Sequence, residues 1–396
     1  MIIRQKKTYK IYFNSNGDKS KYSSYEYCIL ENKDFKSYKF ETSYIGFYEK
    51  NKLYTDLIKL EEIFENYNKL LQPYRAQIDY LLEVEVKNID NIFSDSFNYL
   101  EDDFTLYSLN IKAKSNTTNR WHERGFGARD DLSVLCGLEN ELNGIVSQAL
   151  CQANIKTLQA GFYDVILDPE ATGLLVHEFV GHLFEADNNI ISKEDVIKQK
   201  IVSKSIVNIV DDSTLINGFG TYKFDDEGEP GHKTFLIKNG RLHSLLNNMD
   251  TASKLCVLPT SNARAIDCMH LPIVRMSNTY MLPGQQYTPK DLIESVEFGL
   301  YILGTNDSIT GSRSILGFRE IYIIEKGKIV GRARNMRVME DGLSVLSKIE
   351  MIANDFKIYG GGTGGCFKNG QGPLNVSSGG PHVKLHNVFL LPDVHK

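Results

Sequence analysis

The chain has 396 residues, of which 42% are hydrophobic and 24% charged, and its formal net charge at pH 7 is −5. This length suffices for two or three domains of a globular protein. The negative net charge and the dispersed basic residues argue against an electropositive surface for nucleic acid. No apolar run of about 18 residues occurs, so we expect no helix that spans a membrane.

The N-terminus lacks the apolar stretch of a signal peptide, which makes the cytoplasm the expected location. The six cysteines are widely spaced and form no Cys-x-x-Cys pair, a pattern that favours free thiols in that compartment. Cys366 has mainly glycine and polar neighbours. The other five have apolar neighbours and are expected in the core; they are Cys28, Cys136, Cys151, Cys256 and Cys268.

The N-terminal part predicts an antiparallel sheet and one amphipathic helix. Tyr, Phe and Thr partly alternate with polar residues over residues 8–50, which is typical of short strands. Apolar residues then recur at steps of three and four over residues 53–71, which predicts a helix. Residues 78–89 and 104–113 alternate again, and we expect two strands joined by a flexible acidic turn at residues 101–103.

A stretch rich in arginine and glycine follows at residues 120–129. Its glycines predict a bend. Its arginines have two interpretations: they contact a carboxylate or carbonyl of a bound peptide, or they only tie this stretch to acidic neighbours. A short buried strand is expected from Tyr163 to Leu167.

Residues 168–187 have the features of a helix start followed by a metal-binding motif. Asp168 is suited to cap the N-terminal N–H groups of a helix, and Pro169 suits its first position. The motif itself is His-Glu-x-x-x-His, formed by His177, Glu178 and His182.

The spacing of the two histidines is unusual for a metal site. Five residues of regular helix, at about 100° each, place the side chains about 140° apart. For both histidines to reach one ion, the helix must widen as a π-bulge does, or break. Gly181 is the position that deforms most easily. On spacing alone, the motif is either a variant metal site or an accidental polar patch.

Beyond residue 206, short apolar runs alternate with turn signals such as Asn239-Gly240 and Lys326-Gly327, which predicts a mostly β region. One helix is expected over residues 289–300. The glycine-rich residues 360–380 lack the Gly-Lys-Ser/Thr ending of a phosphate-binding loop, so we reject that interpretation.

Together these features resemble the TldD/PmbA family of metallopeptidases, specifically its zinc-bearing, TldD-like branch. The resemblance covers residues 118–393 well and the first 115 residues poorly. It also implies a helix over residues 131–154. Beyond the histidine motif, the matching segments follow in the order typical of the family: Val210–Asp212, Asp225–Gly228, Arg275–Tyr280, Gly360–Thr363 and Cys366–Pro381.

The resemblance implies an α+β fold, in which an N-terminal α/β part precedes a mostly β C-terminal domain and the zinc-motif helix lies at their junction. We expect a divergent N-terminal α/β domain at residues 1–75 and a central domain at residues 76–160. The C-terminal metallopeptidase domain is expected at residues 161–396.

The resemblance further implies a catalytic zinc ion with three protein ligands. His177 and His182 supply two of them, and Cys366 is the third because its surroundings match the family's cysteine motif. Such a site leaves one position for water, and Glu178 is expected to accept the proton of that water as the general base.

Other candidate residues have less specific roles. Glu185 and Asp187 are expected either to orient the histidines or to face solvent. The acidic residues 225–228 are expected to form a turn near the site. The substrate-binding residues stay unassigned, because the sequence does not rank four candidates for contact with an oxyanion or substrate: His232, His270, Tyr280 and His382.

The functional prediction is a zinc metallopeptidase that cleaves unfolded peptides or trims a precursor or leader peptide. The family implies a zinc-less TldE/PmbA-like subunit, or a second copy of this chain, as partner; no nucleic acid and no membrane is expected. The alternative is a non-enzymatic regulator that binds a peptide or protein on the same scaffold. The intact motif argues against this alternative, because a pure scaffold needs no general base.

Overall fold

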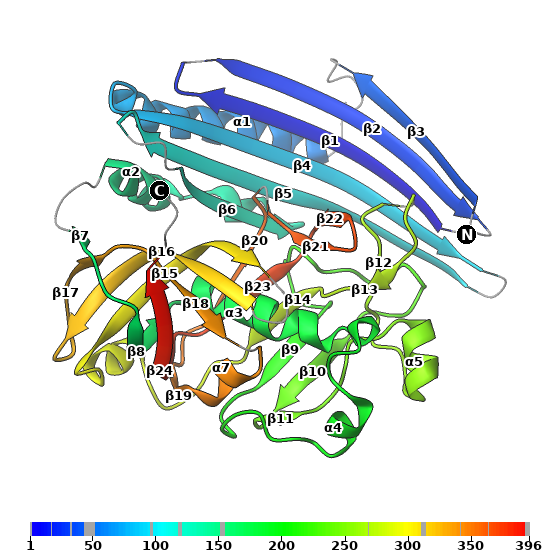
Figure 1. Cartoon of the computed structure of the whole chain (residues 1–396). Coiled ribbons are helices and arrows are strands. Elements are labelled where there is room, and N and C mark those ends of the chain that lie inside the picture. Colours follow the sequence, from blue (N-terminus) through cyan, green and yellow to red (C-terminus); the bar gives the residue numbers. More distant parts are fainter. Residues whose placement is uncertain are drawn as a thin grey trace.

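In the computed structural model, an N-terminal sheet lies across a C-terminal part built mainly of strands (Figure 1). Each part has its own hydrophobic core, with buried apolar residues between Tyr9 and Ala149 in the first and between Val165 and Leu390 in the second. This arrangement confirms the predicted α+β fold. The structure describes residues 2–16, 18–31, 34–42, 52–95, 98–117, 121–150, 155–267, 269–309, 314–340, 342–362 and 364–392.

Six antiparallel strands form the N-terminal sheet in the order β3-β2-β1-β4-β5-β6. Because β1 pairs with β4, the expected domain boundary at residue 75 falls within this one sheet. The predicted strand pair after the helix is confirmed and is longer than expected. The bounds are β1 (Ile2–Asn14), β2 (Lys19–Glu31), β3 (Asp34–Thr42), β4 (Ile78–Ser94), β5 (Tyr99–Ser115) and β6 (His122–Arg129).

Two expectations about this sheet are wrong. The acidic residues 101–103 form no turn, because Asp102 lies in β5 and is buried against Arg129, whose two terminal nitrogens donate to it at 2.5 and 3.0 Å. The glycines of residues 120–129 form no bend, because Gly125 and Gly127 lie within β6. Because these glycines lack a side chain, β6 can lie close to the backbone of Gly361: a Cβ at Gly125 would lie 2.8 Å from the carbonyl oxygen of Gly361.

Alternation along the strands gives this sheet an apolar face and a polar face. Helices α1 (Lys52–Leu71) and α2 (Glu139–Leu150) cover the apolar face, where Phe64 and Ile145 belong to one core with Leu82. The helix predicted over residues 53–71 is thereby confirmed, whereas α2 is shorter than the expected helix because a 3-10 turn at Leu132–Leu135 precedes it. The polar face carries Arg4, Lys6, Lys87 and Asn110, which line cavities shared with the C-terminal part.

The C-terminal part contains two larger sheets. In the first, β15 pairs with both β8 and β16, which closes a ring of five strands through β24 and β18. Its strands are β7 (Ile155–Lys156), β8 (Gly161–Leu167), β15 (Phe298–Ile309), β16 (Ser314–Glu325), β17 (Lys328–Ala333), β18 (Met336–Glu340), β19 (Ile349–Ile352) and β24 (Val383–Pro392).

The second sheet has the order β11-β10-β9-β14-β23-β20, so β20 is an edge strand. Its strands are β9 (Ile209–Asp212), β10 (Lys233–Lys238), β11 (Arg241–Leu242), β14 (Asn278–Met281), β20 (Lys357–Gly360) and β23 (Ser377–Gly380). Two hairpins stand apart from it: β12 (Ala263–Arg264) with β13 (Ile273–Val274), and β21 (Cys366–Lys368) with β22 (Gln371–Leu374).

The motif helix α3 (Pro169–Phe179) lies between these two sheets, in contact with β15 and β16 of the first and with β14, β20 and β23 of the second. The remaining helices are short: α4 (Lys193–Ile197), α5 (Met249–Leu255), α6 (Pro289–Glu294) and α7 (Ser344–Ser347). The helix expected over residues 289–300 is therefore too long, because the chain enters β15 at Phe298. Among the described residues, no helix combines the length and apolarity that crossing a membrane requires.

The cysteine expectation is wrong in one part for each of three residues. Cys28 is buried as expected but is disulfide-bonded, whereas Cys136 and Cys256 are free as expected but lie at the surface. Both exposed thiols follow the end of a helical turn, where the chain leaves the core. Cys366 is buried and free, and Cys151 and Cys268 lie outside the described residues.

Gly173 permits the close packing of α3 on β23, because a Cβ there would lie 2.5 Å from the backbone nitrogen of Gly379. We expect Gly173→Ala to lower the free energy of unfolding by about 1–3 kcal/mol, since the added methyl group forces the backbone apart. Gly144 of α2 is the matched control, because a Cβ there meets nothing within 4 Å. Gly144→Ala should raise the stability by about 0.5–1 kcal/mol. Denaturant unfolding measures both, and equal stability of the two variants would contradict the close approach.

Candidate metal centre

The histidine motif spans the end of α3. Asp168 caps the start of the helix, with its carboxylate accepting hydrogen bonds from the backbone N–H of Ala171 at 2.8 Å and Gly304 at 3.0 Å. The helix stops at Phe179, and Val180 has the non-helical angles φ −125° and ψ −60°. A 3-10 turn, Gly181–Phe184, then carries the second histidine. The predicted alternative of a broken helix is thus confirmed, and no π-bulge forms here.

This break brings the two histidine rings together. The centroids of His177 and His182 lie 5.0 Å apart, with the ring planes at 83°. The new chain direction also presses Gly181 against Met276: a Cβ at this glycine would lie 1.9 Å from the methionine sulfur. Gly181 therefore allows the turn by its small size.

The hairpin of β21 and β22 brings Cys366 to the same place. The ligand atoms of His177, His182 and Cys366 all lie within 4.8 Å of one another, and all three residues are buried. The Cys366 sulfur is 3.7 Å from Nε2 of His182. A tetrahedral zinc site with bonds of 2.0–2.3 Å places its ligand atoms roughly 3.4–3.6 Å apart, so only small shifts would close the cluster around an ion.

The electrostatics of the cluster favour a bound cation. Burial alone would raise the pKa of the Cys366 thiol, but hydrogen bonds and charge from His177 and His182 lower it to about 5. Burial would lower the pKa of His182, but hydrogen bonds to Cys366 and Glu185 raise it to about 10. The protein therefore stabilises a thiolate beside positive charge, and a metal cation can replace the protons that supply this charge.

A buried nitrogen atom without a partner among the described residues also favours a bound cation. Nδ1 of His177 is buried and has no hydrogen-bond partner in the part of the chain that the structure describes, a costly state unless another group occupies it. Imidazole nitrogens and a thiolate are ligands that zinc takes in proteins, and catalytic zinc sites use three protein ligands and keep one coordination position for water or substrate. The residues present therefore fit a zinc ion.

A buried ionic bridge connects the two ligand-bearing segments. Nδ1 of His182 lies 3.1 Å from Glu185, whose carboxylate also lies 3.1 Å from the ammonium group of Lys368. Lys368 further donates to Asp187 at 2.5 Å and to the carbonyl of Val274 at 2.9 Å. Glu185 thus orients a histidine, as one of the two sequence interpretations held, whereas Asp187 contacts Lys368.

Arg275 fixes the cysteine hairpin from behind. Its side chain is 0% exposed and donates to the carbonyl oxygens of Cys366 at 2.5 Å and Gln371 at 3.2 Å, one on each strand. Sequence reasoning missed the roles of Arg275 and Lys368. Both lie in segments that resemble the family, which was the available signal, but their contacts join residues far apart in the chain.

A cavity of about 490 Å³ opens beside the cluster, between the polar face of the N-terminal sheet and α3. One face of α3 contributes residues at positions 170, 174, 177 and 178, which recur at helical spacing. Glu178, which is 8% exposed, therefore lies on the cavity wall next to His177. The opposite walls come from Asn110, from residues 121 and 123–125 at the start of β6, and from the glycines at positions 360–362, 364 and 365.

For the two arginines of residues 120–129 that the structure describes, the second interpretation holds, because both pair with acidic residues. Arg129 is tied to Asp102, and Arg124 pairs with Glu141 of α2 although it also lines the cavity. Arg120 lies outside the described residues. Of the four unranked candidates, none is among the described residues that line this cavity: His232, His270, Tyr280 and His382.

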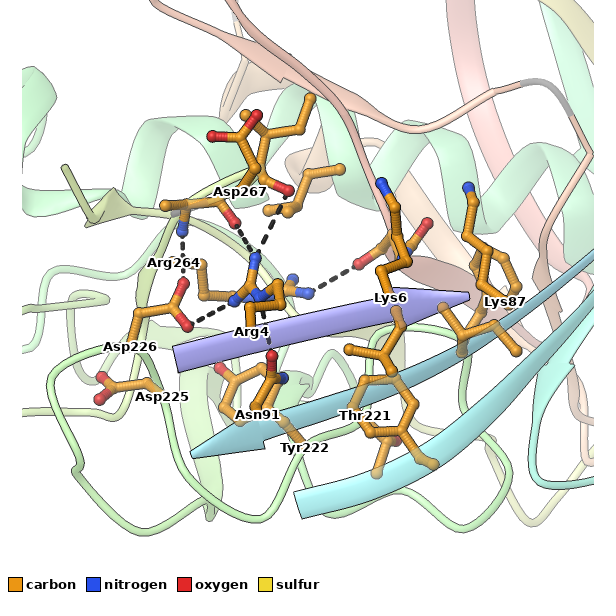
Figure 2. A pocket seen from close by; sticks show the side chains of 18 of the residues that line it. Arg4, Lys6, Lys87, Asn91, Thr221, Tyr222, Asp225, Asp226, Arg264 and Asp267 are labelled. Atoms are coloured by element: carbon orange, nitrogen blue, oxygen red, sulfur yellow. Dashed lines mark hydrogen bonds and ion pairs between the residues drawn. The ribbon is translucent and has the colours of Figure 1, made fainter. Parts of the chain in front are cut away.

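A second cavity, of about 260 Å³, lies under β1 and β4 (Figure 2). Asp225 and Asp226 line it, so the acidic turn at residues 225–228 is not among the described residues of the metal cavity. Figure 2 shows Arg4 directed at Asp226, and their ion pair is 2.7 Å long. Lys6 pairs with Glu26 and Lys87 with Glu85. Three basic residues of this cavity are thus paired within the protein, and we interpret the cavity as part of the joint between the two parts.

Comparison with known proteins finds relatives that are named metalloproteases. The sequence model of the PmbA/TldA metallopeptidase C-terminal domain matches residues 160–390. The chain is 34% identical over 289 residues to "Metalloprotease TldD homolog" of Buchnera aphidicola (subspecies Schizaphis graminum), covering 70% of this chain and 58% of that protein. It is 34% identical over 250 residues to "Zinc metalloprotease TldD homolog" of Saccharolobus solfataricus, covering 62% and 55%. The matched part is therefore less than two thirds of each relative's length.

Among solved structures, TldE from Thermococcus kodakarensis is similar in fold. The TM-score is 0.67 over 98% of this chain and 96% of that one, at 13% sequence identity. At this identity the similarity supports the fold alone, and it extends over the N-terminal sheet as well as the C-terminal part.

The bridge from Glu185 to His182 should tighten metal binding. We expect Glu185→Gln to weaken the metal affinity about 10- to 100-fold, because the amide loses the charge that orients and polarises the imidazole. Competition with a chromogenic chelator measures this affinity. Asp355→Asn is the matched control, since Asp355 holds His382 at 2.7 Å in a similar pair outside the cavity. Unchanged affinity in Glu185→Gln would show that the bridge only supports the fold.

Proposed function

Because this chain belongs to the TldD/PmbA family of metallopeptidases, we propose that it is a zinc-dependent peptidase with Glu178 as its general base. The zinc ligands in this proposal are His177, His182 and Cys366. The observation that carries it is the meeting of these three residues in one buried cluster on the wall of a large cavity. The name of the Saccharolobus solfataricus relative supports zinc as the metal.

Each residue has a defined chemical task in this proposal. When bound, zinc supplies Lewis-acid chemistry, lowering the pKa of a coordinated water to about 7 and polarising a carbonyl group. The Glu178 carboxylate takes the proton from the attacking water and later passes it to the leaving amine. Glu185 keeps the His182 ring in place, and Arg275 holds the main chain of Cys366. Peptide-bond hydrolysis is the result.

The proposed substrates are unfolded peptides, or a precursor peptide that is trimmed. The edge strand β20 supports this, because Tyr359 and Gly360 line the cavity at the end of their sheet. An extended peptide can pair with such an edge through main-chain hydrogen bonds, which tolerate many sequences. A folded substrate has most of its backbone N–H and C=O groups already paired, so it offers fewer of them for such pairing.

We also propose a TldE/PmbA-like subunit or a second copy of this chain as partner. The resemblance to the TldD/PmbA family supports this partner, and TldE is similar to this chain in fold. The proposed compartment is the cytoplasm, where the Cys28 disulfide would be unusual.

The alternative function is a regulator that binds a peptide without cleaving it. A cavity and an edge strand would serve both functions. A glutamate next to a metal-binding histidine on the cavity wall favours the peptidase, because binding alone does not require a group that takes up protons.

Replacing Glu178 separates catalysis from metal binding. We expect Glu178→Gln to reduce cleavage of unfolded casein about 10²- to 10⁴-fold, because the amide cannot accept a proton. Zinc content should remain that of the wild type. Glu123→Gln, which lies on the opposite wall and pairs with Lys112, should keep its activity. Normal activity of Glu178→Gln would overturn the general-base role, and a wild type that binds but never cleaves unfolded peptides would favour the regulator.

A further inference from the structure

The charges that line the metal cavity away from the cluster are already paired within the protein. Three ion pairs account for them: Arg319–Glu170, Arg124–Glu141 and Glu123–Lys112. The first is bidentate, with two hydrogen bonds of 2.6 Å, and the Arg319 side chain is only 2% exposed. A peptide therefore meets little net charge on these walls, so charge is a poor basis for selecting its side chains.

Two apolar side chains line the same cavity as Glu178. Leu174 lies one helical turn before Glu178 on the same face of α3, a spacing that puts their Cβ atoms about 5–6 Å apart. Val376 lines the same cavity, and both apolar residues are half-buried against the C-terminal core. The exposed part of Leu174 therefore presents apolar surface one helical turn from the carboxylate proposed to activate water, and Val376 adds apolar surface to the same cavity.

Trp121 adds a large apolar surface from the N-terminal part. It lines this cavity just before β6 and is 44% exposed. The ammonium group of Lys114 lies 5.1 Å from its ring centroid, so a cation–π contact holds the ring at one face. Covering the exposed part of such a ring with an apolar group removes water from both surfaces and is favourable.

We propose that Leu174, Val376 and Trp121 form an apolar subsite beside the scissile bond. This subsite selects peptides that carry an aromatic or large aliphatic side chain next to the bond that is cut. The inference rests on the proposed peptidase function and adds the class of substrate. Leu174 and Val376 receive the side chain, and Trp121 covers it from the opposite wall.

Direct binding tests the subsite without turnover. Trp121 is the sole tryptophan of the chain, so tryptophan emission reports on this position alone. Zinc-loaded Glu178→Gln protein would be titrated with two Trp-free peptides that differ only in Phe or Asp at one central position. We expect the Phe peptide to change the emission and to bind about tenfold or more tightly, as burial of a Phe side chain implies.

Cleavage by the wild type provides the second measurement, as the ratio of kcat/KM for the Phe peptide to that for the Asp peptide. Trp121→Ala should lower this ratio about tenfold, and it should fold normally because Trp121 is well exposed. Leu174→Ala should lower it as well. Leu258→Ala, at a surface position that is 85% exposed, should leave it unchanged.

The outcomes separate this inference from the function on which it rests. A ratio that falls in Trp121→Ala but not in Leu258→Ala supports the subsite. Equal cleavage of both peptides, with no change in emission, overturns the subsite and leaves the peptidase intact. A zinc-loaded wild type that cleaves neither peptide nor casein overturns both.

Discussion

The candidate metal centre depends on one long-range contact, in which Cys366 lies against His182, 184 positions earlier in the chain. Burying a thiolate and a charged histidine is unfavourable unless each has a partner. Glu185 and Lys368 supply that pairing, and Arg275 fixes the main chain of Cys366. Loss of one partner would leave an uncompensated buried charge, so the cluster and its supports stabilise one another.

The N-terminal sheet completes the site, although the three candidate ligand residues come from the C-terminal part. Its apolar face is used by α1 and α2, which leaves the polar face to cover the cavity. Arg4 joins this face to Asp226, and Gly125 lets β6 approach the glycine-rich loop at Gly361. Of the first 115 residues, which resemble the family least, only Asn110 is among the described residues that line the metal cavity; the rest of its N-terminal wall lies in the segment that resembles the family.

Local patterns predicted local structure well. The apolar spacing over residues 53–71 gave a helix, the alternation after it gave β4 and β5, and the five-residue spacing of the histidines required a distorted helix. Contacts between distant segments were beyond such reasoning. In the local sequence Gly125 is a turn signal. The structural reason for a glycine at this position is the close approach of the Gly361 backbone, which local sequence does not reveal. Lys368 sits among polar residues, so nothing local indicates that it is buried in an ionic bridge.

The account's central claim is that two distant segments hold one metal ion, and zinc content tests it most directly. Purified wild type, Cys366→Ala and Cys256→Ala would be compared by elemental analysis, since Cys256 is a free thiol at the surface. We predict about one zinc ion per chain in the wild type and in Cys256→Ala, and its loss or marked weakening in Cys366→Ala. Equal zinc in both variants would show that another residue is the third ligand. No zinc in any of the three, even after reconstitution, would contradict the metal centre itself.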